Sequence, residues 1–144
     1  MRMATVSPTI KSQLLSVAPV FKEPKGAVLF RRNEPAFGIF LICKGSVSLR
    51  LEAEDGTSGW DRTAMSDSIV GLAGTLSGSR YSLTAVVSEE CELAFLGRGV
   101  VLDLIKNDPN VGLGLMQTLA EEIAQARAVL STTSNSSLSE PASN

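Results

Sequence analysis

The feature of this sequence that most constrains its fold is a central region of short apolar runs, each ended by turn-forming residues. Between residues 27 and 101 the runs are separated by glycine, by Asn-Glu-Pro, by Asp-Gly and by serine-rich breaks. This spacing is typical of a compact antiparallel roll of short strands. The sequence therefore predicts a mainly β fold with flanking helices, built around a jelly-roll-like antiparallel β-roll.

Several strands can be placed within the roll. Residues 37–43 form a continuous apolar stretch, which is consistent with a buried strand. Apolar and polar residues alternate over residues 47–51, so this strand is expected to have one solvent-exposed face. The Asp-Gly pair at residues 55–56 supplies a hairpin turn. Two further strands are expected at residues 82–87 and 92–96.

Helical patterns lie on both sides of the roll. Ser7 followed by Pro8, before apolar residues at helical spacing, predicts a capped amphipathic helix. After residue 99 the spacing predicts a short helix that ends near Asn107. Asp108 and Pro109 then predict the start of a longer helix with an apolar stripe, reaching about residue 130.

The pattern places one domain at residues 8–130. Glu121 and Glu122 are expected mostly away from the apolar side of the long helix. Residues 131–144 are rich in serine, threonine and asparagine, and we expect them to form a disordered tail.

Composition excludes several classes of function. The chain has 144 residues and no histidine, which rules out Ser-His-Asp or Cys-His catalytic sets and histidine-ligated zinc, iron or haem. We therefore expect neither an enzyme nor a metal site. The net charge of −2, without a cluster of lysine or arginine, argues against nucleic-acid binding by this chain alone.

The expected compartment is the cytoplasm. The amino terminus lacks the long apolar region of a signal peptide, and no apolar run approaches the roughly 18 residues that a membrane span needs. Cys43 and Cys91 each lie in an apolar run and resemble buried small hydrophobic residues, which suits a reducing compartment.

The segment from residue 69 to residue 85 is the main candidate for a binding site. It has an apolar approach, a turn punctuated by Gly71, Gly74 and Gly78, then Arg80 and a new strand. Unpaired backbone amides beside a guanidinium make a pocket suited to phosphate. The glycines can instead serve only tight turns, where a positive φ favours glycine.

Four motifs, in their order and spacing, resemble a known family. They resemble the cyclic nucleotide-binding domains that form the effector half of catabolite-activator and related regulators. Residues 26–34 resemble the family's first hairpin and residues 37–47 its second. Residues 68–85 fall at its phosphate-binding cassette, and residues 91–96 resemble its last strand. The resemblance covers roughly residues 10–130 and implies a ligand-binding regulatory domain.

The cassette departs from the family at its carboxylate. Family members that bind nucleotides carry Gly-Glu-Leu or Gly-Glu-Ile there, and the glutamate accepts hydrogen bonds from the ribose 2′-hydroxyl. The matching residues here are Gly71, Leu72 and Ala73, so a leucine stands at the position of the glutamate. Hydrogen bonds to charged groups contribute about 1.5–3 kcal/mol, so the change predicts roughly 10- to 150-fold weaker recognition of the ribose.

The family's phosphate-binding arginine has two possible counterparts. Arg80 is the obvious one, but the spacing to the strand at Cys91 favours Tyr81. If the strand runs regularly from residue 80, Tyr81 faces inward with Leu83 and Arg80 points outward; if residues 77–81 form a loop, Arg80 can turn inward. The candidate ligand-binding residues are therefore Gly71, Leu72, Ala73, Arg80, Tyr81 and Ser82.

Two descriptions of function follow from these residues. In the first, a stand-alone regulatory domain senses a small anion, such as a cyclic nucleotide, in a non-standard pocket and shifts its C-terminal helix. In the second, the pocket is degenerate and empty, and the chain is an interaction module. The helix at residues 109–130 has small and apolar residues beyond those that one roll needs, which suggests a homodimer.

Overall fold

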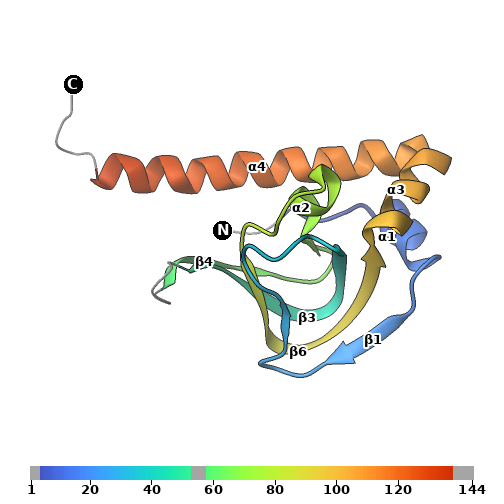
Figure 1. The fold of residues 1–144 in the computed structure, drawn as a ribbon, viewed down its shortest axis with the longest axis horizontal. Helices are drawn as coiled ribbons and strands as arrows, with labels where there is room; N and C mark the ends of the chain where they lie inside the picture. The colour runs from blue at the N-terminus through green and yellow to red at the C-terminus, as the bar shows by residue number, and fades with distance from the viewer. Residues whose placement is uncertain (1–3, 53–57, 138–144) are drawn as a thin grey trace.

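The computed structural model describes residues 4–52 and 58–137. It shows an antiparallel sheet curled into a roll, with a long helix crossing one side (Figure 1). The mainly β fold class predicted from the sequence is confirmed. In chain order the elements are α1 (Pro8–Leu15), β1 (Val20–Glu23), β2 (Val28–Phe30), β3 (Gly38–Glu52), β4 (Ser58–Ala64), β5 (Ile69–Val70), α2 (Leu72–Ser77), β6 (Thr84–Gly97), α3 (Arg98–Asn107) and α4 (Pro109–Ser137).

Two long strands form the centre of the sheet. Its order is β1-β6-β3-β4, with β2 also paired to β6 and β5 to β3. β3 and β6 pair antiparallel from Gly38 opposite Gly97 to Arg50 opposite Thr84. The expectation of short strands was wrong here. Residues 38–43 and 47–51 both belong to β3, and most of residues 82–87 and all of 92–96 belong to β6.

A bulged region explains why Gly45, between the strands predicted at residues 37–43 and 47–51, does not end β3. The register with β6 shifts three times between Ile42 and Val47. Gly45 lies there with φ at +94°, and a Cβ on it would collide with the carbonyl oxygen of Glu90. Only glycine combines that backbone angle with so close an approach. The strand therefore bends at Gly45 and continues, which helps the sheet to close into a roll.

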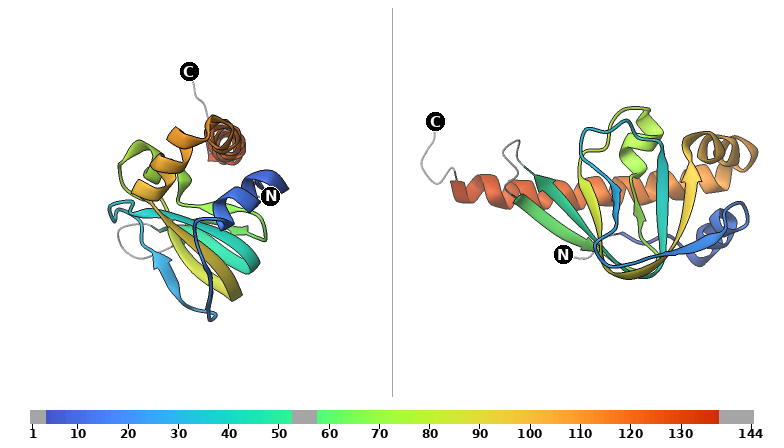
Figure 2. Two further views of the ribbon diagram at one scale, coloured as in Figure 1. Left: turned by 90° about the vertical axis from the view of Figure 1, so that its right-hand side faces the viewer. Right: turned by 60° about the horizontal axis from the view of Figure 1, so that its bottom comes forward.

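Alternation along the strands divides the core in two. In β3, Phe40 and Ile42 face the interior of the roll, whereas Ile39 and Leu41 face the helices. This explains why residues 38–42 are apolar without alternation: both faces of the strand are buried there. The second cluster also contains Leu14 of α1, Val101 of α3, and Val111 and Leu115 of α4. Figure 2 shows α1, α3 and α4 gathered on that side of the roll.

The predicted helix starts are confirmed. The Ser7 hydroxyl accepts a hydrogen bond from the amide of Ile10 at 3.2 Å, and Pro8 is the first residue of α1. The Asp108 carboxylate accepts one from the amide of Asn110 at 3.1 Å, and α4 begins at Pro109. α4 continues to Ser137, past residue 130, where the sequence pattern placed its end.

Three other expectations from the sequence concern a turn, the two cysteines and membrane spans. The Asp-Gly turn at residues 55–56 lies outside the described residues. Cys91 is buried, Cys43 is partly buried, and both are free thiols. Within the part of the chain that the structure describes, no helix is both long and apolar enough to cross a membrane.

Candidate functional site

The segment at residues 69–85 contains a short helix where the sequence suggested a glycine-punctuated turn. Gly71 takes a left-handed conformation, with φ at +88°, between β5 and α2, and Gly78 ends α2 in the same way, with φ at +70°. A Cβ on Gly71 would lie 2.8 Å from a ring carbon of Tyr81. Gly71 and Gly78 therefore serve the two tight turns that frame α2.

Leu72 is part of the hydrophobic core. Its side chain is 1% exposed and belongs to the cluster between the sheet and the helices. The Nε of Arg98, at the start of α3, donates to the carbonyl of Thr75 at 2.9 Å and holds α2 against this cluster. Leu72, which the resemblance matches to the family's glutamate, therefore lies among packed apolar side chains.

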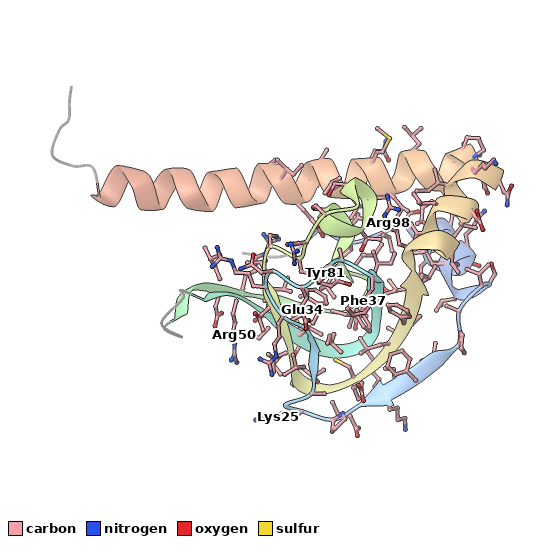
Figure 3. The ribbon with its side chains drawn as sticks, viewed as in Figure 1. Lys25, Glu34, Phe37, Arg50, Tyr81 and Arg98 are labelled. Carbon is pink, nitrogen blue, oxygen red and sulfur yellow. The ribbon has the colours of Figure 1, made fainter. Side chains whose placement is uncertain are left out.

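Tyr81 fills the interior of the roll. It is 2% exposed, and its ring stacks on Phe30 with centroids 3.7 Å apart. The hydroxyl donates to the carbonyl of Gly38 at 2.6 Å and accepts from the amide of Gly38 at 3.2 Å. Burial raises the pKa of this phenol. Figure 3 shows the ring inside the roll, near Phe37.

Arg80 points away from the interior. Its side chain is exposed, its Nη1 donates to the carbonyl of Asn33 at 2.6 Å, and its backbone forms a bridge with Pro35. Of the two orientations that the sequence left open, the structure therefore has Tyr81 inward and Arg80 outward. Arg80 lines an open pocket of about 560 Å³ on the surface, together with Arg32, Ser79 and Ser82.

A cavity of about 300 Å³ lies between the roll and α4. This volume is at the lower end of the roughly 300–1,000 Å³ that is usual for small-molecule sites. Five of the six predicted residues line it, and Arg80 does not: they are Gly71, Leu72, Ala73, Tyr81 and Ser82. Most of the remaining wall is apolar. It includes Leu49 and Leu51 of β3 and Leu119 and Ile123 of α4.

Sequence reasoning missed the two charged residues of the cavity wall. Arg62 reaches it from β4 and Glu122 from α4. The expectation that Glu122 lies away from the apolar side of the helix was wrong. Leu115, Leu119 and Glu122 follow at spacings of four and three residues, and this helical spacing was the available signal. An acidic residue that shares the apolar stripe of a helix is expected to face the buried side of that helix.

Glu122 is in an unusual electrostatic environment. Its Oε2 is buried and accepts no hydrogen bond from the residues that the structure describes. Burial raises the pKa of the carboxyl to about 7, the charge of Glu121 acts in the same direction, and the positive charge of Arg62 opposes them. Near neutral pH the cavity therefore holds a carboxyl that is close to half ionised.

This environment predicts that the protein loses stability as pH rises. The folded protein keeps the Glu122 proton up to about pH 7, whereas the unfolded chain releases it near the ordinary pKa of 4.5. Between these values a rise in pH favours the unfolded state, because the folded state binds more protons. Urea unfolding should find Glu122→Gln more stable than wild type at pH 8, by on the order of 2–3 kcal/mol.

The same comparison at pH 4.5 should show little difference between the two proteins, since the introduced glutamine and the protonated glutamate are both neutral. Glu121→Gln, a change at the exposed neighbour on the same helix, is the matched control. If the wild type were as stable as Glu122→Gln at pH 8, the carboxyl of Glu122 would not be buried in its ionised form.

Among the side chains that the structure describes, in residues 4–51 and 61–124, no group of three or more histidine, cysteine, aspartate or glutamate is placed to hold a metal ion. The charged groups of the cavity wall are Glu122 and Arg62, and Ser82 adds a hydroxyl.

Comparisons with known proteins agree with this architecture. The family described as cyclic nucleotide-binding domain matches residues 21–108. The catabolite activator protein of Thermus thermophilus is 25% identical with a TM-score of 0.76, over 89% of this chain and 60% of that one. The sensor domain of the transcriptional regulator DNR from Pseudomonas aeruginosa is 20% identical with a TM-score of 0.62, over 95% and 85% of the two chains.

A further solved structure has the same fold. The N-terminal domain of a transcriptional regulator from Streptomyces coelicolor A3(2) is 17% identical with a TM-score of 0.65, over 85% of this chain and 87% of that one. No curated protein matches the sequence. The chain spans only 60% of the Thermus protein, so the properties of that whole regulator do not transfer to it directly.

Proposed function

Because the chain belongs to the family of cyclic nucleotide-binding domains, we propose that it is a regulatory domain that binds a small anion or nucleotide in the cavity between the roll and α4. The proposed role is non-catalytic, in keeping with a sequence without histidine. The free thiols Cys43 and Cys91 suit a regulator in the reducing cytoplasm.

The observation that carries this proposal is the composition of the cavity wall. The wall joins the cassette, through Gly71–Gly74 and Tyr81–Leu83, to α4, through Leu119 and Ile123. A ligand in the cavity would contact both at once and fix the position of α4 against the roll. Ligands shift a conformational equilibrium only through such differential contacts.

The binding mode must differ from the one that the resemblance implies. Leu72 and Tyr81 both lie in the packed core, so neither offers a carboxylate to a ribose nor a guanidinium to a cyclic phosphate. The apolar wall suits the planar base of a nucleotide better than its phosphate. We therefore propose that a bound nucleotide places its base in the cavity and its charged part toward solvent.

Thermal unfolding and calorimetry with cyclic AMP and cyclic GMP test the proposal. We expect at least one of them, at millimolar concentration, to raise the melting temperature, since a ligand of the native state stabilises it. Ala73→Trp, at an exposed position on the cavity wall, should abolish the shift. Arg80→Ala, outside the cavity, should retain it. No shift with either nucleotide would leave the ligand-free module as the better description.

The second candidate function, an interaction module, is supported by one face of α4. Leu113, Met116, Ala120 and Ile123 are separated by three, four and three residues, as in the seam of a coiled coil. All four are exposed, with 57%, 63% and 50% for the three large side chains Leu113, Met116 and Ile123. We propose that this stripe pairs with its copy in a homodimer.

Light scattering coupled to gel filtration should therefore find a dimer at tens of micromolar protein. Leu113→Glu and Met116→Glu should each convert it to a monomer, because they place like charges opposite each other across the two-fold axis. Gln117→Glu adds the same charge next to the stripe and should change the dimer much less. A wild type that elutes only as a monomer would remove the proposal of a homodimer.

A further inference from the structure

The two halves of α4 are held to the rest of the protein in different ways. In the first half, Val111 and Leu115 are fully buried in the cluster between the sheet and the helices. In the described part of the second half, residues 119–124, only Leu119 and Glu122 are even partly buried. A segment with few buried contacts can separate from the rest of a protein without global unfolding.

The second half of α4 covers the cavity. Leu119, Glu122 and Ile123 form its part of the cavity wall, so they face a partly empty space where a packed core would otherwise lie. Figure 1 shows α4 crossing the roll and continuing beyond it. Little packing is therefore lost when this half of the helix moves away from the roll.

Glu122 makes this contact sensitive to protons. Its Oε2 is shielded from solvent, and no residue that the structure describes donates a hydrogen bond to it. An ionised carboxylate in this place has lost its hydration, which it regains if the helix moves outward. A protonated carboxyl loses much less on burial, so the protonated form favours the helix position seen in the structure.

The other groups around Glu122 do not cancel this effect. Arg62 of β4 is the cation that the described residues bring to the cavity wall. Burial outweighs its charge and raises the pKa of Glu122 to about 7, and Glu121 of α4 adds to the rise. The wall residues from β2, β3, β5, α2 and residues 81–83 carry no charged side chain, and the Tyr81 phenol, whose pKa is raised, stays neutral.

Resting on the proposed function, we infer that α4 from Leu119 onward is a lid on the cavity that protons control: it lies on the roll while Glu122 is protonated and separates from the roll when the carboxyl ionises. Because the closed lid holds the proton more tightly than the open lid, a rise in pH favours opening. The interval between the ordinary pKa of 4.5 and about 7 limits this shift to about 300-fold. A ligand in the cavity should therefore bind more tightly below pH 7 than above it.

The distance between two spin labels measures the lid directly, with no ligand present. One label is attached at Ala124→Cys, an exposed position of α4, and the other at Val28→Cys, an exposed position of β2, after Cys43 and Cys91 are replaced by alanine. At pH 5 we expect one narrow distribution of distances. At pH 8 a second population should appear, and its ratio to the first should be at least tenfold higher than at pH 5.

Variants of α4 assign the response to one side chain. Glu122→Gln is neutral at both pH values, so it should keep the narrow distribution at pH 5 and at pH 8. Glu121→Gln, at the exposed neighbour on the same helix, should respond to pH as the wild type does. Circular dichroism at each pH confirms that every labelled protein is folded.

Hydrogen exchange repeats the comparison on unlabelled protein, without the cysteine substitutions. At pH 8 the amides of residues 119–124 should exchange at least tenfold faster in wild type than in Glu122→Gln, and faster than those of residues 109–115 of the same protein. Equal exchange in the two proteins would contradict the lid.

The outcomes separate this inference from the proposed function. Wild-type distances that are the same at pH 5 and pH 8, or a pH response that survives Glu122→Gln, overturn the proton-controlled lid and leave the cavity as a ligand site. A pH response as expected, in a protein that binds neither cyclic AMP nor cyclic GMP, keeps the motion of α4 and removes its role in ligand binding.

Discussion

A Leu72→Glu variant should lose about 3–5 kcal/mol of its free energy of unfolding, the usual cost of a buried charge without a partner. Leu72 is 1% exposed and packs among the apolar side chains that join the sheet to the helices. A carboxylate there would lose its hydration without gaining a partner. Because small domains have only about 5–15 kcal/mol of stability in total, much of this variant is expected to be unfolded at 37 °C.

Chemical denaturation followed by circular dichroism measures this loss. Ala73→Glu is the matched control, because it adds the same carboxyl at the next position of α2, where the side chain is exposed. It should change the stability by no more than about 0.5 kcal/mol. If Leu72→Glu were as stable as wild type, residue 72 would be free to face a ligand, and our explanation of the altered cassette would be wrong.

A Tyr81→Ala variant should be destabilised by about 3–5 kcal/mol, as is usual for large aromatic side chains removed from a core. The change removes the stack on Phe30 and both hydrogen bonds to Gly38. Tyr81→Phe keeps the ring and loses only the hydroxyl, so it should cost about 1–3 kcal/mol, because the buried carbonyl of Gly38 loses its side-chain donor.

Arg80→Ala is the matched control for Tyr81. The Arg80 side chain is exposed and makes one hydrogen bond, to the carbonyl of Asn33. Its loss should cost less than about 1 kcal/mol. If Arg80→Ala were the more damaging of the two changes, the inward and outward positions would be reversed, and Arg80 would again be a candidate for binding phosphate.

Local signals predicted the starts of α1 and α4 correctly because their causes are local. Ser7 accepts from an amide three residues ahead, and Asp108 accepts from one two residues ahead. The short helix α2 and the end of α4 were not predicted. The strands were predicted in kind but not in length. Gly45 indicates a turn in the sequence, but its positive φ serves a bulge, because the partner strand β6 continues past it and holds β3 in place.

The candidate site was predicted in part. Five of the six residues assigned to it line the cavity, since the cassette is one contiguous segment. Glu122 was missed because its importance depends on which face of α4 meets the roll. That face is set by Leu115, Val111 and their contacts in the core, and a list of residues on the helix does not reveal it.

The sequence by itself determined the class of fold, because strand periodicity and turn residues can be read along the chain. Only the tertiary structure decided that Tyr81 rather than Arg80 points inward, and that Glu122 enters the cavity. Both outcomes depend on long-range packing: the pairing of residues 80–81 with the segment at residues 33–35, and the rotation of α4 against the sheet. In both cases the contacts between distant segments decided which side chain faces the interior.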